Sequence, residues 1–155
     1  MKQSPDQSDL MKNFSPSKFS AGGFLGNDTR TIGEIISADL KVLEKNDIEK
    51  EALAGTLQSW YDRAKAAMGG ETEIAPGVTA MYHEARGKIP SPFRGEGTFE
   101  KGDVVLREAS SGKEVVLTCL SIHLIRAHGF FQGKGQRFRV DPADIIDIIK
   151  RTGTQ

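Results

Sequence analysis

Two of the three histidines lie in one short segment and are the residues best suited to chemistry. His123 and His128 have four residues between them, and the only cysteine, Cys119, lies four positions before His123. This histidine spacing occurs in Cys/His zinc sites. However, residues five apart on a regular helix diverge by about 140°, and no cysteine pair precedes the histidines. We therefore predict no metal site and no cofactor, since the histidines could share an ion only if the last helical turn tightened.

Histidine also serves in general acid–base catalysis, because it titrates near neutral pH. For a metal-assisted or His-dependent hydrolase, the candidate catalytic residues are His123, His128 and Glu84, with His83 in addition. The alternative is that His123 is a partly buried helix residue and that His128 caps the helix C-terminus. The chain has no Gly-x-Ser-x-Gly nucleophile motif. We therefore favour a non-enzymatic function over the hydrolase.

The histidines lie within a segregated basic segment. Residues 115–140 contain no Asp or Glu, and their bases alternate with phenylalanines and glycines. Aromatic rings beside cations suit single-stranded nucleic acid, and glycine amides beside a lysine suit phosphate or carboxylate. The candidate ligand-binding residues here are His123, Arg126, His128, Phe130, Phe131, Lys134, Arg137 and Arg139. The alternative is that the phenylalanines are core anchors and that the arginines pair with acids of the last helix.

The loop from Arg86 to Gly95 adds Arg86, Lys88 and Arg94, with no acid before Glu96. Residues 87–97 contain prolines and flanking glycines, which predicts a connection without secondary structure. If this loop lay beside the glycine-rich loop 129–135, the two would form a basic rim around the histidines. Alternatively, its prolines only block a sheet edge. Our leading hypothesis is a binding or interaction protein for an anionic partner: single-stranded nucleic acid, phosphate or an acidic protein.

Two amphipathic helices are predicted near the N-terminus. Thr31-Ile32-Gly33-Glu34 has the spacing of a capping box, and apolar residues then recur at helical spacing. A second start signal at Asn46 precedes a helix that extends to about Met68. The short loop between the helices predicts an antiparallel helical hairpin. A third hypothesis is that Trp60 and Tyr61 on this hairpin form a partner-binding or dimerising face.

The rest of the chain predicts strands followed by two helices. A turn over 73–78 leads into a strand over 78–85, and residues 103–108 and 113–118 flank a hairpin turn. A helix over 120–128 ends at Gly129, and Asp141 caps the last helix. We therefore predict an α+β fold with an N-terminal helical hairpin, a small, mostly antiparallel sheet of three or four strands, and two C-terminal helices.

Length and composition limit the remaining alternatives. A chain of 155 residues corresponds to one domain, which we place over 21–153, after a disordered polar tail over 1–20. The single cysteine excludes an internal disulfide and a zinc site of several thiolates. No apolar run could span a membrane, and the polar N-terminus is not a secretory signal. We therefore expect a cytoplasmic protein without a membrane partner; equal numbers of acids and bases still permit a local basic patch.

Residues Leu120 to Pro142 resemble a group of uncharacterised bacterial proteins. The resemblance lies in Leu-Ser-Ile-His-Leu-Ile-Arg-Ala-His-Gly-Phe-Phe, Gln-Gly-Lys-Gly and Phe-Arg-Val-Asp-Pro, with a weaker echo over residues 23–28. It implies a small soluble bacterial protein. Because that group has no assigned activity, the resemblance implies no functional residues.

Overall fold

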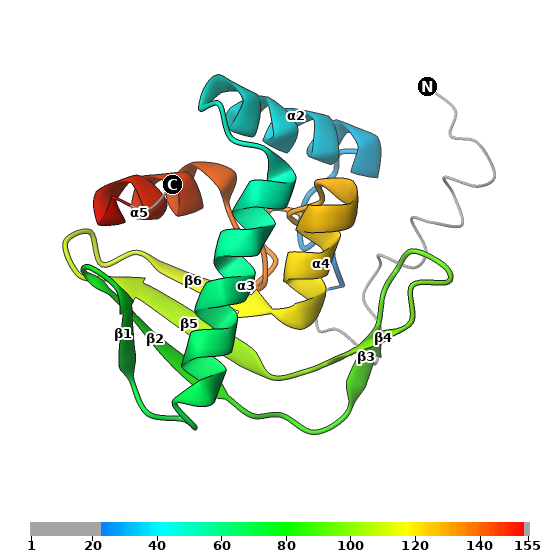
Figure 1. The fold of residues 1–155 in the computed structure, drawn as a ribbon. Coiled ribbons are helices and arrows are strands. Elements are labelled where there is room, and N and C mark those ends of the chain that lie inside the picture. The colour runs from blue at the N-terminus through cyan, green and yellow to red at the C-terminus, as the bar shows by residue number, and fades with distance from the viewer. Residues whose placement is uncertain (1–22, 154–155) are drawn as a thin grey trace.

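The computed structural model describes residues 23–153, so the predicted tail over 1–20 lies outside the described residues. The fold is α+β, as predicted (Figure 1). Its helices are α2 (Ile32–Lys45), α3 (Lys50–Ala66), α4 (Cys119–His128) and α5 (Pro142–Thr152). Its strands are β1 (Thr72–Ala75), β2 (Val78–His83), β3 (Lys88–Pro90), β4 (Thr98–Glu100), β5 (Asp103–Glu108) and β6 (Glu114–Thr118).

The strands form two antiparallel sheets. The larger has four strands in the order β1-β2-β5-β6, and the smaller is the β3–β4 ribbon. The predicted hairpin is confirmed, with Val105 opposite Val116 across β5 and β6. The prediction that 87–97 has no secondary structure is wrong, because β3 begins there and pairs with β4. Strand β1 was taken for part of a turn, since a four-residue strand with one buried residue, Ile74, gives no clear alternation.

Local capping residues set the ends of the helices. The predicted capping box is present: Glu34 N donates to Thr31 Oγ1 at 3.1 Å, and Thr31 N donates to Glu34 Oε1 at 3.0 Å. Asp141 caps α5 as predicted. Asn46 instead ends α2, since its side-chain amide donates to Val42 O at 2.8 Å, and α3 starts after Glu49.

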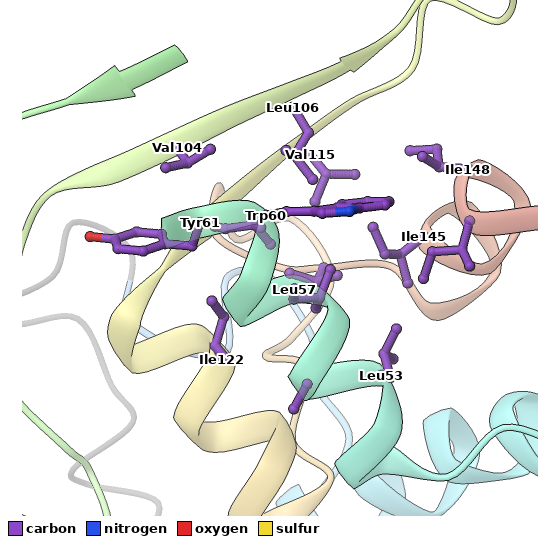
Figure 2. Packing of buried hydrophobic residues seen from close by; sticks show 14 of the residues in the cluster. Leu53, Leu57, Trp60, Tyr61, Val104, Leu106, Val115, Ile122, Ile145 and Ile148 are labelled. Carbon is purple, nitrogen blue, oxygen red and sulfur yellow. The ribbon is translucent and has the colours of Figure 1, made fainter. Parts of the chain in front are cut away.

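The two N-terminal helices are present but do not lie side by side. Figure 1 shows α2 running across the end of α3, and α2 packs on α5 whereas α3 packs on α4 and the sheet. The apolar face of α3 explains this arrangement, because Trp60 and Tyr61 are 3% and 1% exposed beneath the sheet (Figure 2). The hypothesis of a partner-binding face through Trp60 and Tyr61 is therefore wrong.

The buried apolar residues form two clusters. The larger lies between the four-stranded sheet and the helices, and Figure 2 shows Trp60 between sheet residues such as Leu106 and α5 residues such as Ile145. The smaller joins the segment before α2 to α4, and Phe93 and Phe99 of the β3–β4 region pack against it. This smaller cluster fixes the β3–β4 ribbon beside α4 (Figure 1). No helix within 23–153 is long and apolar enough to cross a membrane.

Candidate metal site of Glu96, His123 and His128

Two histidines of α4 converge on one carboxylate of the loop between β3 and β4. His123 Nε2 lies 2.9 Å from Glu96 Oε1, and His128 Nε2 lies 2.7 Å from Glu96 Oε2. All three side chains are half-buried, at 27%, 27% and 21% exposure. One ligand atom from each residue can be chosen so that all three lie within 4.8 Å of one another.

Helix α4 presents both imidazoles without tightening its last turn. It is α-helical from Cys119 to His128 and ends at Gly129, which has a left-handed φ of 66°. The predicted divergence of about 140° holds for the side-chain directions on the helix. Glu96 contacts both imidazoles despite this divergence, because each of its two carboxylate oxygens faces a different ring. The imidazole rings lie edge to face, with centroids 6.3 Å apart.

The loop over 91–97 holds Glu96 in place through its own hydrogen bonds. Ser91 Oγ donates to Glu96 Oε1 at 2.7 Å and accepts from Phe93 N at 3.1 Å. Ser91 N donates to Gly97 O at 3.1 Å, which closes the loop. A residue that hydrogen-bonds a metal-ligating carboxylate fixes its orientation, and Ser91 is placed to do so for Glu96.

Two aromatic rings restrict the histidines from the loop side. The Phe93 ring stacks on the His128 imidazole, with centroids 3.7 Å apart and an interplanar angle of 17°. Phe99 of β4 lies 4.8 Å from His123 in a tilted arrangement. Because both phenylalanines also pack against the smaller apolar cluster, the core itself sets the orientation of the two imidazoles.

Electrostatics keep Glu96 ionised. Burial raises the pKa of the Glu96 carboxyl, but hydrogen bonds from His123, Ser91 and His128 outweigh it and hold the pKa below its ordinary value. An ionised carboxylate can only accept hydrogen bonds, so each facing Nε2 carries a proton when no metal is bound. A metal ion in this position would displace both protons and take the two nitrogens and a carboxylate oxygen as ligands.

The distances suit a first-row divalent ion. Ligands about 2.0–2.1 Å from zinc in a tetrahedron stand about 3.3 Å from one another. The observed contacts of 2.9 and 2.7 Å join the two imidazoles to different oxygens of Glu96, and one ligand atom from each residue lies within 4.8 Å of the others. An ion would therefore need the side chains to shift from a hydrogen-bonded to a coordinating arrangement. Helix geometry and the absence of a preceding cysteine pair were the grounds for predicting no metal site, and neither of them points to Glu96 as a possible third donor. The signal for it was an acid isolated between two glycines in a basic loop.

The other residues of the predicted hydrolase site lie elsewhere. Glu84 is exposed beyond the end of β2, and it is Glu96 that contacts both α4 histidines. His83 hydrogen-bonds Asp103 on the neighbouring strand β5, at 3.0 Å. Strand β2 pairs with β1 and β5 in the large sheet, whereas the histidines face the β3–β4 ribbon. Of the acids considered, Glu96 and not Glu84 is the hydrogen-bond partner of His123 in the part of the chain that the structure describes.

Two central amides of the glycine-rich loop 129–135 are bonded within the chain and not available to an anion. Gly133 N donates to Phe24 O at 2.8 Å, and Lys134 N donates to Asp28 Oδ2 at 3.1 Å. A Cβ on Gly133 would lie 2.2 Å from Leu25 O. Glycine is needed here so that this loop can approach the backbone of residues 23–28.

Several members of the predicted basic surface are buried or point away from the histidines. Phe130 and Phe131 are 0% and 1% exposed, so they are core anchors, as the alternative held, and cannot stack on a ligand. Arg139 is paired with Asp39 at 2.8 Å, with 10% of its side chain exposed, and is not available to a partner. Arg126 is exposed, but it lies on another side of α4 from the two histidines. On a regular helix its side chain points about 130° away from the mean direction of His123 and His128.

The remaining predicted cations are exposed and scattered. They are Arg86, Lys88, Arg94, Lys134 and Arg137. Arg137 lies 3.9 Å from Asp103 and over the Phe138 ring, 5.0 Å from its centroid. Arg94 belongs to the loop that carries Glu96. That these cations contact an anionic partner stays a prediction.

No protein-family model, no curated protein and no solved structure matches this chain.

Proposed function

We propose that the protein binds one divalent transition-metal ion through His123, His128 and Glu96. The observation that supports this most strongly is the convergence of three donor groups from two separate segments within 4.8 Å. Two imidazole nitrogens and one carboxylate oxygen form the ligand set of catalytic zinc sites and of non-haem iron sites. In both classes the metal keeps positions for water or substrate.

The number of ligands favours a catalytic over a structural role. Structural zinc sites have four protein ligands, whereas catalytic sites have three. Within residues 23–153, the candidate cluster contains only these three ligand-type residues. A divalent ion held there would polarise a water molecule in its open position, which is the chemistry of metal-assisted hydrolysis. Glu96 is fixed by Ser91, so the carboxylate is oriented before the ion binds.

Charge next to the site favours an anionic substrate or ligand. Arg94 lies two positions before Glu96 in the same loop and is exposed, with no ion-pair partner among the described residues. A guanidinium on the loop that carries a metal ligand adds positive potential near that loop, which favours phosphate or carboxylate groups. We therefore extend the proposal to metal-assisted hydrolysis of a substrate that carries such a group.

Titration with Co²⁺ tests the metal proposal directly. The protein is stripped with a chelator, freed of it by gel filtration, and titrated while the visible absorption of Co²⁺ is recorded. We expect saturation at one equivalent and displacement by Zn²⁺. Glu96→Gln and His128→Ala should each weaken Co²⁺ binding at least about a hundredfold, since even residues that only orient ligands cost 10- to 100-fold.

The third histidine supplies a matched control. His83→Gln changes a histidine that pairs with Asp103 outside the cluster, so it should leave the Co²⁺ affinity unchanged. Circular dichroism melting of each variant reports whether the fold is retained. Absence of stoichiometric Co²⁺ binding, or equal losses in His83→Gln and His128→Ala, would contradict the proposal. Hydrolysis is tested separately. The Zn²⁺-loaded protein and its Arg94→Ala variant are compared in the cleavage of bis(p-nitrophenyl) phosphate.

A further inference from the structure

A cavity lies outside the histidine cluster, between the start of α4 and the segment before α5. We propose that it binds a small neutral molecule with an apolar body and an N–H donor, such as a primary amide, which hydrogen-bonds to Gln132 Oε1. The cavity has a volume of about 250 Å³. Its lining includes neither His123, His128 nor Glu96, so the proposal is independent of the metal site.

The walls of the cavity are mostly apolar. Phe24, Ile89, Leu120 and Phe138 line it, each from a different segment of the chain. Leu120 and Ile89 belong to α4 and β3, which the smaller apolar cluster holds together. Small-molecule sites typically combine apolar walls with a few polar groups that fix orientation. The walls therefore suit a flat or compact hydrocarbon body.

Gln132 supplies a polar group with no partner of its own. It lines the cavity and is 3% exposed, yet its Oε1 is buried without a hydrogen bond. Buried carbonyl oxygens in native proteins nearly always have a partner, because leaving one unpaired is costly. A donor from a bound molecule would satisfy this oxygen.

The backbone around Gln132 is held in an unfavourable conformation. Its φ is 73°, in the left-handed region, where a non-glycine residue is uncommon. Arg139 Nη1 donates to Gln132 O at 2.6 Å, and this arginine is itself fixed by Asp39. Strained residues that the surrounding structure fixes occur preferentially at ligand sites. The strain therefore supports a binding role for this side chain.

The charged residues of the lining point to a neutral ligand. Two acids, Glu100 and Asp103, face two bases, Lys101 and Arg137, so the formal charges balance. Glu100 already accepts hydrogen bonds from Tyr61 and Lys65. Asp103 lies 3.0 Å from His83 and 3.9 Å from Arg137. A ligand with net charge would upset this balance, whereas a neutral amide would not.

Binding of three matched probes tests the proposal. Benzamide, benzylamine and benzoate share one ring and differ in their polar group, and each is titrated into ¹⁵N-labelled full-length protein. Benzamide should bind with a millimolar Kd and shift the amide resonances of Lys101, Leu120 and Phe138. Benzoate has no donor and should bind at least about tenfold more weakly, the effect of one buried hydrogen bond. Benzylamine can donate to Gln132 Oε1 but carries a net charge, so it should also bind more weakly than benzamide because the formal charges of the lining already balance. Equal binding of all three, or no shift at these residues, would overturn the proposal.

A pair of glutamine variants separates ligand binding from folding. Gln132→Leu removes the unpaired acceptor, so benzamide binding should weaken at least about tenfold while Tm stays the same or rises. Gln58→Leu is the control, since Gln58 belongs to α3, its side chain donates to Asp62 of the same helix, and it does not line the cavity. It should leave benzamide affinity unchanged. If Gln132→Leu does not fold, the three-probe comparison on the unmodified protein still decides the question.

Discussion

The guanidinium of Arg139 donates to both carboxylate oxygens of Asp39, at 2.8 and 2.9 Å, although the two residues are 100 positions apart. The pair is buried, with 10% and 7% of the side chains exposed. Burial lowers the pKa of Arg139, but the hydrogen bonds to Asp39 outweigh it and raise the pKa above its ordinary value. Arg139 also donates to the backbone oxygen of Gln132. The pair therefore links α2 to the wall of the cavity that Gln132 lines.

Breaking this pair should destabilise the fold strongly. Arg139→Ala or Asp39→Ala leaves one buried charge without its partner, which typically costs about 3–5 kcal/mol of unfolding free energy. The double variant should cost clearly less than the sum of the two, since neither charge is then stranded. Urea unfolding of the four proteins measures this coupling. Strictly additive losses would show that the two residues act independently.

The charge on Asp28 should make stability depend on pH in acid. Hydrogen bonds from the Arg30 side chain, then from the backbone amides of Lys134 and Arg30, outweigh burial and hold the pKa of Asp28 well below its ordinary value. The unfolded chain therefore takes up this proton first. The contribution is complete above the unfolded pKa of about 3.9 and is lost as pH falls through the lower folded pKa.

A comparison with Asp28→Asn isolates this contribution. At about pH 7 the unmodified protein should be more stable by about 1.5–3 kcal/mol, the range for hydrogen bonds to a charged group. Below about pH 4 the difference should shrink, since Asp28 of the unfolded state becomes protonated. Urea unfolding at both pH values gives the two differences. An equal difference at both would mean that the charge of Asp28 is not the cause.

Glycine is required directly after His128. Gly129 has a φ of 66°, and a Cβ there would lie 2.7 Å from Leu40 Cδ2. Gly129→Ala should therefore cost at least about 1–2 kcal/mol from the left-handed backbone alone. Gly55→Ala is the control, since a Cβ at Gly55 of α3 meets nothing within 4 Å. It should stabilise the protein by about 0.5–1 kcal/mol, and thermal melting measures both changes.

Phe93 should act as a positioning residue for His128. Its ring stacks on the imidazole at 3.7 Å and makes no coordinate bond, so Phe93→Leu should weaken Co²⁺ binding by about tenfold, as loss of a supporting contact does. The stoichiometry of one Co²⁺ per chain should be retained. Absorption titration gives both quantities. An unchanged affinity would show that the stacking does not restrict the imidazole.

Local sequence patterns were sufficient for most of the helices and for the central hairpin. The N-terminal ends of α2 and α5 were predicted because their capping groups lie within three residues of the backbone amides they satisfy. Strands β1, β3 and β4 were missed, since strands of three or four residues contain too little alternation to recognise. The orientation of α2 relative to α3 was also missed, because it depends on packing with α4 and α5 and not on the connecting loop.

The sequence by itself placed two histidines on one short helix and a basic segment around them. Only the tertiary structure brought Glu96 of a distant loop between the imidazoles and paired Arg139 with Asp39. The physical reason is that a helix repeats every 3.6 residues, so spacing along the chain specifies neighbours on its own surface. Contacts with other segments depend on the burial of apolar side chains, here of Phe93 and Phe99 against the smaller cluster. No local sequence pattern predicts which segments pack together in this way.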